Sequence, residues 1–437
     1  MKEQIKKIVG PGALKAYHMG KSHVASLLYG RPASDMTVIG VTGTNGKTTT
    51  CNLIAAIFEQ ALYKVALCTT IQYRIMGEEV ANVSKMTAPD PFTLNAFIAQ
   101  AKKQGCNVLV IEVTSHGLDQ ERFAGISFDI GVLTNITHDH LDYHQTFDHY
   151  VQAKRKLFAR GLRLAVLNYD DQNGRELVNT PADVHILYST LSNTAVHPHT
   201  IRHVDDQTSF DVVFPDTGFT LPITTYLPGQ FNISNILAAV CVGVMWGVEQ
   251  KTISDAITSV KSIPGRMDKV DVGQPFTVLI DYAHTPDAFT KLYEAIVPLA
   301  KGHHIISVFG ATGDRDKTKR PILGSIAAEH AHFIVVTNED PYTEDPQAII
   351  DQVAAGVRDV GKHSEGKSFW RMIDRKAAIL HAIRLAKPGD IVTVTGKGAE
   401  VAMVWGSEHR PWSDRAIILE CLDEAGYGTQ ASTDSSL

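Results

Sequence analysis

The chain has few cysteines, no paired C-x-x-C motif and no long apolar run. Its five cysteines, Cys51, Cys68, Cys106, Cys241 and Cys421, are scattered through 437 residues. An odd number of isolated cysteines predicts buried, reduced thiols rather than disulfides or a zinc site. No apolar stretch reaches the roughly 18 residues of a membrane span, and the basic N-terminus lacks the apolar segment of a secretory signal. We therefore expect a cytoplasmic protein without membrane insertion.

An excess of positive charge is also missing. The 41 lysines and arginines are outnumbered by 47 aspartates and glutamates, so the formal net charge is −6. This mild acidity gives no sign of a basic surface that would bind nucleic acid or an anionic membrane. Apolar residues make up 44% of the chain and charged residues 20%, as in ordinary globular proteins. We expect a monomer whose partners are small-molecule substrates.

Strands and helices alternate along most of the chain, which predicts an α/β fold. Short apolar, β-branched runs at residues 107–113, 128–135 and 162–168 have the spacing of βαβ units. They predict a mostly parallel sheet covered on both faces. Residues 184–227 change to short alternating pieces, which predicts a local antiparallel excursion. A stretch with Pro and Gly then separates this part from a second α/β series. We therefore place a domain boundary near Ser262.

The stretch VIGVTGTNGKTTT, residues 38–50, has the features of a phosphate-binding loop. An apolar strand ends in glycines and leads into a helix, so backbone N–H groups and the helix dipole favour an anion there. In such a loop Lys47 reaches the outer phosphates and Thr48 offers its hydroxyl to Mg²⁺. The predicted ATP-binding residues of the loop are Gly43, Thr44, Asn45, Gly46, Lys47, Thr48 and Thr49.

The loop departs from strict Walker spacing, which requires glycine at the position of Val41. A glycine-rich turn that merely closes a βα unit is therefore the alternative interpretation. The strand before it, the helix after it and the intact Gly-Lys-Thr favour nucleotide binding. They say nothing about which acceptor is used.

A second block, residues 111–158, reads IEVTSHGLDQERFAGISFDIGVLTNITHDHLDYHQTFDHYVQAKRKLF. Together with TGTNGKTTT it resembles the Mur ligases, the ATP-dependent amide-bond formers of peptidoglycan precursor synthesis. Further matches occur in the family's order: LPGQFNISNILAA, IPGRMDKVD, DYAHTPDA, GATGDRDKTKRP and GKGAE. The resemblance covers roughly residues 38–415. It points to the tripeptide synthetases, which add the third amino acid to UDP-N-acetylmuramoyl-L-Ala-D-Glu.

The resemblance implies a central P-loop ATPase domain with a mostly parallel sheet, followed by a C-terminal Rossmann-like α/β domain that closes over ATP and amino acid. We assign residues 37–262 to the first and residues 263–425 to the second. Residues 1–36 are expected to be a short helical remnant, and residues 426–437 a flexible tail.

The chemistry of amide formation explains which residue types such a site needs. A carboxylate resists attack by an amine because its oxygen is a very poor leaving group. Phosphorylation by ATP converts it to an acyl phosphate, which the amine then attacks. The enzyme mainly aligns the reactants and neutralises charge. Hard oxygen ligands for Mg²⁺ and cationic clamps are therefore expected.

The resemblance implies that Lys47, Glu112, His140 and Lys154 are the catalytic residues. Glu112 and His140 match Mg²⁺ ligands, and Lys154 matches a lysine that carries a carbamate, so the implied metal set is Thr48, Glu112, His140 and carbamylated Lys154. Without the motif, Glu112 would be a salt-bridged strand end and Lys154 a solvated helix residue. The neighbouring histidines and aspartates of THDHLDYH resemble a zinc cluster, but no thiolate is near and Mg²⁺ suits an ATP site better.

Other matched positions surround the substrates. The implied ATP contacts beyond the loop are Asn232, Arg266, Asp281, Tyr282 and His284. His284 on composition alone would be a structural histidine. The implied acceptor contacts are Thr87, Thr114, Ser115, Gln120 and Arg122. Thr114 stands where the family usually has serine, and it keeps the hydroxyl.

The N-terminal end departs from the family. Tripeptide synthetases of this type carry about a hundred residues that hold the uridine end of the substrate, whereas here TGTNGKT begins at Thr42. The segment 12–30 is expected to form one amphipathic helix. Its apolar positions are Leu14, Tyr17, Val24, Leu27 and Leu28. Recognition of UDP is then weaker, reassigned or not required.

The amino-acid pocket departs as well. Members that add diaminopimelate carry Asp-Asn-Pro-Arg, whose arginine holds the distal carboxylate; here the chain reads Glu339, Asp340, Pro341 and Tyr342. We hypothesise a cationic amino acid, lysine or ornithine, near Glu339, Asp340 or Glu344. A solvated acidic loop is an equal alternative. Implied amino-acid contacts are Glu339, Asp340, Arg375, Gly396 and Glu400.

The sequence therefore predicts an ATP- and Mg²⁺-dependent ligase that adds a diamino acid to the D-Glu of a muramoyl dipeptide. One alternative is a related ligase acting on a folate-type, polyglutamate or lipid-linked carrier. The other is a catalytically silent ATP-binding protein, which would have no need of a carbamate lysine.

Overall fold

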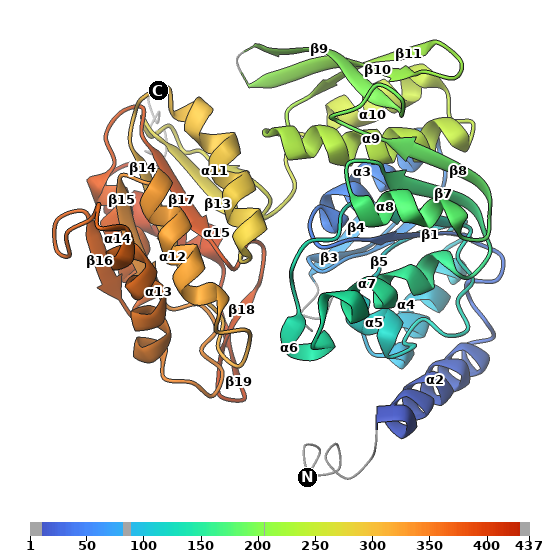
Figure 1. Ribbon diagram of the computed structural model, residues 1–437, viewed down its shortest axis with the longest axis horizontal. Coiled ribbons are helices and arrows are strands. Elements are labelled where there is room, and N and C mark those ends of the chain that lie inside the picture. The colour runs from blue at the N-terminus through green and yellow to red at the C-terminus, as the bar shows by residue number, and fades with distance from the viewer. Residues whose placement is uncertain (1–10, 82–88, 205, 429–437) are drawn as a thin grey trace, which may run out of the picture. The chain divides into compact units, whose positions relative to one another are not determined.

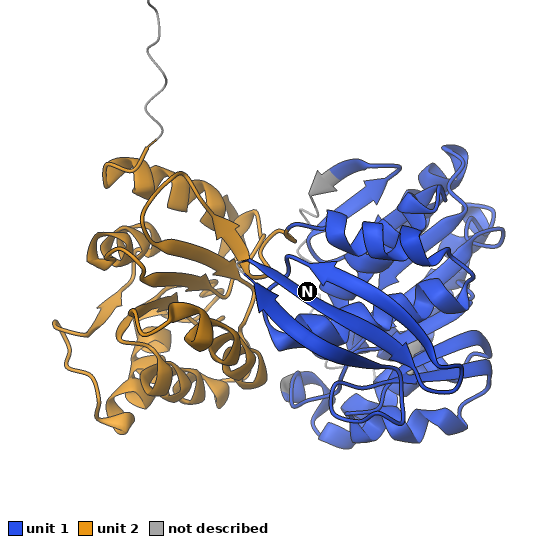
Figure 2. Cartoon of the chain, turned by 90° about the horizontal axis from the view of Figure 1, so that it is seen from above, with its two compact units in different colours: residues 1–261 blue, residues 262–437 orange. Residues whose placement is uncertain are grey.

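The computed structural model describes residues 11–81, 89–204 and 206–428, which belong to two compact units. Unit 1 comprises residues 1–261 and unit 2 comprises residues 262–437 (Figure 2). Each unit is built around its own mostly parallel sheet, so the predicted α/β class is confirmed.

Unit 1 contains an eight-stranded sheet in the order β4-β3-β2-β5-β1-β6-β7-β8. Neighbours from β2 to β8 pair in parallel, while β3 and β4 form an antiparallel hairpin at one edge. The strands are β1 (Thr37–Thr42), β2 (Val65–Cys68), β3 (Gln72–Ile75), β4 (Glu78–Ala81), β5 (Val108–Glu112), β6 (Ile130–Leu133), β7 (Leu162–Asn168) and β8 (Ala182–Tyr188). The central β1 lies between β5 and β6, so the ends of these strands meet at one edge of the sheet.

Helices cover both faces of this sheet (Figure 1). One face carries α3 and α9, and the other carries α4, α5 and α7. The helices of unit 1 are α2 (Pro11–Leu28), α3 (Lys47–Gln60), α4 (Pro91–Lys103), α5 (Ser115–Asp119), α6 (Leu141–His144), α7 (Phe147–Phe158), α8 (Gln172–Glu176), α9 (Gln230–Met245) and α10 (Gln250–Ser259), with a short 3-10 turn at Leu177–Asn179.

The predicted antiparallel excursion is found, but it begins later than the sequence indicated. A separate three-stranded antiparallel sheet contains β9 (His197–Val204), β10 (Gln207–Phe214) and β11 (Phe219–Thr225). Strand β8, which the prediction had included in this excursion, instead pairs in parallel with β7. Residues 182–187 of β8 are at least partly exposed, because β8 lies at the sheet edge, where only one strand pairs with it.

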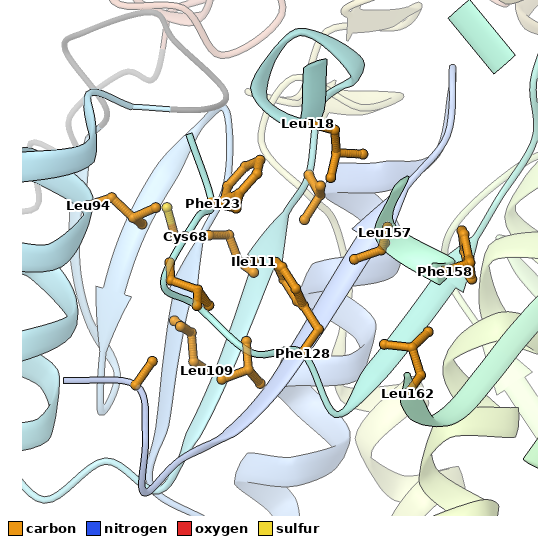
Figure 3. Close-up of a cluster of buried hydrophobic side chains, with 14 of the residues drawn as sticks. Cys68, Leu94, Leu109, Ile111, Leu118, Phe123, Phe128, Leu157, Phe158 and Leu162 are labelled. Carbon is orange, nitrogen blue, oxygen red and sulfur yellow. The ribbon is translucent and has the colours of Figure 1, made fainter. Parts of the chain in front are cut away.

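The core of unit 1 lies under α4, α5 and α7 (Figure 3). Leu109 and Ile111 of β5 contribute to it from the sheet, and Phe123 and Phe128 from the chain between α5 and β6. The ring of Phe128 also packs against β1, where an added Cβ at Gly40 would lie 2.7 Å from it. Glycine at this position therefore lets an aromatic side chain lie directly on the central strand.

Unit 2 contains a six-stranded sheet in the order β12-β13-β17-β14-β15-β16, in which only β12 is antiparallel. Its strands are β12 (Asp268–Val270), β13 (Thr277–Asp281), β14 (Ile305–Phe309), β15 (Phe333–Thr337), β16 (Phe369–Met372) and β17 (Ile391–Thr395), followed by a hairpin of β18 (Ala402–Trp405) and β19 (Glu408–Pro411). Its helices are α11 (Pro286–Ala300), α12 (Lys319–His330), α13 (Pro346–Val360), α14 (Arg375–Leu385) and α15 (Asp414–Glu424).

Helix α2 lies in the segment where one amphipathic helix was expected, and its apolar residues Tyr17, Val24, Leu27 and Leu28 are exposed. Of the expected tail, residues 429–437 lie outside the described residues, whereas the ring of Tyr427 packs edge-on to Phe276 at 5.2 Å between centroids.

The five cysteines are buried and unpaired, as the sequence indicated. Among the described helices, none combines the length and the apolar character that a membrane span requires.

The core cluster generates a stability prediction. Phe123→Ala removes a fully buried ring, and we expect it to destabilise unit 1 by about 3–5 kcal/mol. Chemical unfolding followed by circular dichroism measures the change in the transition midpoint. Leu62→Ala, at a leucine that is 91% exposed, is the matched control and should leave the midpoint unchanged. Equal effects of the two variants would contradict this description of the core.

Candidate functional site

The phosphate loop lies between β1 and α3 and depends on two glycines in positive-φ conformations. Gly43 has φ 154°, and a Cβ there would lie 1.8 Å from Thr134 Oγ1. Gly46 precedes α3 with φ 83°, and a Cβ there would lie 2.3 Å from Asn235 Oδ1. Both close approaches require glycine. Because Gly46 has no side chain, no side chain caps the helix at this position.

The segment that follows β6 clamps the loop in place. Thr44 N donates to the carbonyl of Asn135 at 2.7 Å, and Asn45 N donates to Asn135 Oδ1 at 3.0 Å. In return Asn135 Nδ2 and Thr134 Oγ1 donate to the carbonyl of Asn45, at 3.0 and 2.6 Å. Sequence reasoning did not single out Thr134 and Asn135. Their position at the end of a strand adjacent to the loop strand was the available signal.

Glu112 ends β5 with its carboxylate buried beside the loop helix. Its Oε2 accepts from Thr48 Oγ1 at 2.9 Å and from Thr70 N at 3.0 Å. Its Oε1 lies 3.8 Å from Lys47 Nζ, which also donates to the carbonyl of Thr44 at 2.9 Å. The structure therefore brings together three predicted residues, Lys47, Thr48 and Glu112.

Lys154 is buried on α7 and reaches the other side of the same loop. Its Nζ donates to the carbonyl of Gly43 at 2.7 Å and lies 4.6 Å from the centroid of the Tyr150 ring. Burial lowers the pKa of the Lys154 ammonium well below its ordinary value, and the cation of Lys47 lowers it further. The carboxylates of Asp139, Glu112 and Asp171 oppose this shift. The environment of Lys154 thus favours the neutral amine form of its side chain beside the phosphate loop.

His140 precedes α6 in a left-handed conformation, with φ 55°, which is rare for a residue with a side chain. Loss of hydration lowers the pKa of its imidazole; Asp139 opposes this shift, and His116, Lys154 and Lys47 lower it further. A neutral imidazole is the form that binds a metal. The ring centroid of His140 lies 4.8 Å from that of His116, in a cluster that also includes Tyr143.

Four of the five predicted acceptor residues lie at α5. Thr114 caps this helix by accepting from Gly117 N, and Ser115 Oγ lies 3.0 Å from His144 Nε2. Gln120 accepts from Arg122 Nε at 2.9 Å and donates to the hydroxyl of Tyr143. Burial lowers the pKa of the Arg122 guanidinium. The fifth residue, Thr87, lies outside the described residues.

Asn232 reaches the phosphate loop only through another asparagine. Asn235 Nδ2 donates to Asn232 Oδ1 at 3.0 Å, and Asn235 Oδ1 accepts from Thr50 Oγ1 at 3.4 Å. Asn235 lies one turn along α9 from Asn232 and approaches Gly46. Sequence reasoning missed Asn235, although it lies within the matched stretch.

The predicted ATP-binding residues of unit 2 form one group at the end of β13. Asp281 accepts from the backbone N–H groups of Met267 and Ala283, at 2.8 and 2.7 Å. Burial raises the pKa of Asp281, and Arg266 opposes that shift. The guanidinium of Arg266 lies 4.5 Å from the Tyr282 ring centroid, and His284 Nδ1 lies 2.8 Å from the carbonyl of Tyr282.

The predicted amino-acid residues are not equally available. Arg375 forms a buried ion pair with Asp414 at 2.7 and 2.8 Å, and its remaining nitrogens donate to backbone carbonyls. Asp340 accepts from Lys397 Nζ at 2.9 Å and from Val404 N at 2.7 Å. Glu400 accepts from the same Lys397 at 2.8 Å. The side chain of Arg375 therefore stabilises unit 2 and is not part of the proposed amino-acid site.

Glu344 was also included in the hypothesis for a cationic substrate. Its carboxylate already binds two cations of the protein. It forms two hydrogen bonds with Arg320 at 2.9 Å and an ion pair with Lys317. The Arg320 guanidinium is the main cause that lowers the pKa of Glu344 to about 2. A substrate ammonium would compete with two cations already in place.

Glu339 differs from these acids because part of its carboxylate is unsatisfied. Oε1 accepts from Thr312 Oγ1 at 2.6 Å, while Oε2 has no hydrogen-bond partner among the described residues. A Cβ at Gly396 would lie 2.4 Å from Oε2, so glycine there makes room for the carboxylate. Burial raises the pKa of Glu339. A buried acceptor without a partner costs free energy, and a ligand that donates to it would recover that cost.

The donor set beside the loop fits Mg²⁺ in type. The hydroxyl of Thr48 and the carboxylate of Glu112 are hard oxygen ligands, and they already lie in contact. Within the described parts of the chain, no three His, Cys, Asp or Glu side chains lie close enough to hold a metal by themselves. The neighbouring histidines are committed elsewhere, since His138 stacks on Phe147 and His144 contacts Ser115.

Two α/β units, one with a phosphate loop beside a buried glutamate and a buried lysine, match known families over most of their length. A model of the Mur ligase middle domain matches residues 41–243, and a model of the Mur ligase glutamate ligase domain matches residues 265–398. A UDP-N-acetylmuramoyl-L-alanyl-D-glutamate–2,6-diaminopimelate ligase of Bacillus cereus is 38% identical over 91% of this chain and 80% of its own. A UDP-N-acetylmuramyl-tripeptide synthetase of Roseiflexus is 37% identical over 93% and 82%. The chain belongs to the Mur ligase family, and the predicted enzyme class, an ATP-dependent ligase, is confirmed.

Solved structures agree on the fold. A UDP-N-acetylmuramoyl-L-alanyl-D-glutamate–2,6-diaminopimelate ligase superposes with a TM-score of 0.61 at 29% identity, covering 92% of this chain and 81% of its own. A folylpolyglutamate synthase of Mycobacterium tuberculosis complexed with ADP has a TM-score of 0.72 at 17% identity, covering 97% and 98%. At that identity the second likeness shows the shared fold alone.

The burial of Lys154 generates a prediction about pH. A lysine whose pKa is lowered by folding binds fewer protons in the folded state than in the unfolded state, so stability rises with pH up to the unfolded pKa, about 10.4. We expect wild type to gain stability relative to Lys154→Met between pH 7 and about pH 9.5. Chemical unfolding in CO₂-free buffer measures the difference. A constant difference, or one of opposite sign, would show that Lys154 is charged in the folded protein.

Proposed function

We propose that this chain joins an amino acid to the D-glutamyl carboxylate of UDP-N-acetylmuramoyl-L-Ala-D-Glu, with hydrolysis of ATP to ADP and phosphate, in the cytoplasm. The observation that carries the proposal is the group formed by Lys47, Thr48, Glu112 and Lys154 around one phosphate loop. The names of the relatives, which are 37–38% identical over nine-tenths of the chain, support the choice of acceptor and reaction.

The reaction proceeds in two steps in this proposal. The acceptor carboxylate attacks the γ-phosphorus of ATP, the bond to the β-phosphate oxygen breaks, and ADP leaves. The amine of the incoming amino acid then attacks the acyl phosphate carbon, loses a proton and expels inorganic phosphate. The backbone of the phosphate loop and the ammonium of Lys47 stabilise the charge that moves between the phosphate oxygens.

Mg²⁺, held by Thr48 and Glu112, would neutralise phosphate charge while ATP is bound. His140 is the third proposed protein ligand, because its lowered pKa keeps the imidazole neutral. In the absence of the ion, Lys47 and the hydroxyl of Thr48 balance the Glu112 carboxylate.

Lys154 is the proposed carbamate residue. Carbon dioxide adds only to a neutral amine, and burial, which lowers the pKa of Lys154, favours that form. Addition of CO₂ and loss of a proton convert the side chain into a carboxylate-like anion beside the cation of Lys47. The cation of Lys47, which makes an ammonium at this position unfavourable, would therefore favour the carbamate anion.

The acceptor is proposed to bind along α5. Arg122 provides a guanidinium for a carboxylate or for the sugar end, and Gln120 orients it through its hydrogen bond to Nε. Thr114 and Ser115 present hydroxyl groups one residue apart at the start of α5. Thr87 is retained as a proposed acceptor contact on the resemblance alone.

The incoming amino acid is proposed to be cationic, and Glu339 is the proposed contact for its ammonium group. The unsatisfied Oε2 of Glu339 is the available acceptor, whereas Asp340, Glu344 and Glu400 already bind cations. Gly396 and Glu400 remain proposed contacts, and Glu400 also accepts from the hydroxyl of Tyr282 at 3.4 Å.

Two other functions remain as alternatives to be tested. The first is a ligase of the same chemistry that uses a folate-type, polyglutamate or lipid-linked carrier; ADP release with the muramoyl dipeptide would argue against it. The second is a catalytically silent ATP-binding protein. A silent binder has no use for a lysine with a lowered pKa next to its phosphate loop, so Lys154 favours a ligase.

The carbamate assignment predicts a chemical rescue. Lys154→Ala should lower the rate of ADP release by about 100-fold or more, and formate or acetate should restore part of it by occupying the space of the carbamate. A coupled assay of ADP release measures both effects.

Lys156→Ala is the matched control, because Lys156 lies on the same helix in an exposed ion pair with Asp119 at 2.7 Å. It should retain nearly the full rate. Undiminished turnover in Lys154→Ala would remove the carbamate from the mechanism and leave the ligase proposal intact.

The choice of amino acid predicts a selective response. With UDP-N-acetylmuramoyl-L-Ala-D-Glu as acceptor, we expect ADP release with L-lysine or L-ornithine and none with meso-diaminopimelate, because Glu339 attracts an ammonium and repels a second carboxylate. Mass spectrometry of the product identifies the residue added.

Glu339→Gln separates amino-acid binding from catalysis. This variant should raise the KM for the amine about tenfold while the KM for ATP stays unchanged. Turnover with diaminopimelate alone would contradict an acidic pocket for a cationic side chain. Silence with all three amines, while ATP still binds, would contradict the muramoyl dipeptide as acceptor.

A further inference from the structure

Helix α2 exposes four large apolar side chains, which together are called the stripe. Tyr17 is 62% exposed, Val24 49%, Leu27 59% and Leu28 71%. Tyr17, Val24 and Leu28 are separated by seven and four residues, so they lie along one face of the helix, and Leu27 borders it. Met19 and Tyr29 are also exposed nearby. A soluble surface rarely carries so many large apolar side chains in one place without a partner.

The opposite face of α2 fixes the helix to unit 1. Ser22, Ala25 and Ser26 are buried there, and Ser26 Oγ donates to the carbonyl of Gly125 at 3.2 Å. Lys21, four residues after Tyr17 and seven before Leu28, lies on the stripe side of α2 and forms an ion pair with Asp90, the residue that caps α4. In Figure 1, α2 (blue) lies beside α4 and α5. Small side chains face the protein and large apolar ones face away, which reverses the usual pattern for a helix that only supports a fold.

The same end of the chain carries a concentrated positive charge. Residues 1–31 contain six basic residues and one acidic residue, a net charge of +5 in a chain whose net charge is −6. The remaining residues therefore carry −11. The overall acidity, which argued against an anionic partner, conceals this local excess. Within the described residues, Lys21 of α2 is already paired with Asp90, and Arg31 lies three residues after the helix.

We propose that α2 is a peripheral membrane-binding helix that lies in the surface of an anionic phospholipid bilayer. An exposed apolar stripe on a helix, with basic residues in the same segment, fits a negatively charged surface with an apolar interior. Tyr17 and Tyr29, at opposite ends of the stripe, have the amphipathic side chains that are enriched at the membrane interface. A straight stripe can meet a plane along its whole length, while the rest of unit 1 stays in water.

Charge complementarity is what favours lipid over a protein partner or a second copy. A second copy would bring +5 against +5 at this segment, which disfavours association. The helices described in the structure lack the length and apolar character of a span, which agrees with binding at the surface. The inference is independent of the proposed reaction, because none of the stripe residues belongs to the candidate site.

The test uses the full chain and sedimentation with vesicles. We expect at least about tenfold tighter binding to vesicles of phosphatidylcholine with phosphatidylglycerol than to phosphatidylcholine alone, and weaker binding at high salt. The double variant Leu27→Ser/Leu28→Ser should bind the anionic vesicles about tenfold more weakly. Its ADP release and its circular dichroism should match those of wild type.

The matched control is Leu62→Ser/Leu191→Ser, which removes two leucines of 91% and 79% exposure outside the stripe. This control should bind vesicles as wild type does. The proposal is overturned if wild type ignores anionic vesicles, or if the stripe and control variants bind them equally. A dimer in wild type that the stripe variant converts to monomer, without vesicle binding, would assign the stripe to a second copy and also overturn it.

Discussion

The buried carboxylate of Glu112 is the constraint on which the candidate site depends. A carboxylate removed from water costs several kcal/mol unless charges and hydrogen bonds compensate it. Here the compensation comes from the Thr48 hydroxyl, the Thr70 amide and the nearby ammonium of Lys47. The strand register explains why they meet, since Glu112 pairs with Val41 of β1 and the phosphate loop begins two residues later. The order of the strands thus places the start of α3 where its residues can compensate the charge of Glu112.

The order of the central strands brings the rest of the site to this position. Strands β5, β1 and β6 are neighbours, so their carboxyl ends bring together three segments that are far apart in the sequence. The segment after β6 supplies Thr134 and Asn135, which hold the loop backbone from the side opposite Glu112. Lys154 on α7 then donates to the carbonyl of Gly43. The backbone of the phosphate loop therefore has polar contacts from both neighbouring segments.

The sequence predicted the parts of this arrangement that are local. Apolar runs of four to seven residues identified β1, β5, β6 and β7, because strands buried on both faces are continuously apolar. The glycines of the phosphate loop and the Gly-Lys-Thr that follows are equally local. Edge position is a tertiary property, which is why β8 was assigned to the wrong sheet. The apolar positions of α2 were visible in the sequence for the same local reason, but an apolar face does not identify what covers it.

Charge pairing within unit 2 illustrates what sequence could not determine. An acidic run is visible in the sequence, but which acids already have cations depends on contacts between residues up to 57 positions apart. Glu344 binds Arg320 and Lys317, Asp414 binds Arg375, and Asp340 and Glu400 share Lys397. The remaining acid of this group is Glu339, with one carboxylate oxygen unsatisfied beside Gly396. Since five acids share four cations, the proposed substrate ammonium would balance the group, whereas a second substrate carboxylate would add to the imbalance.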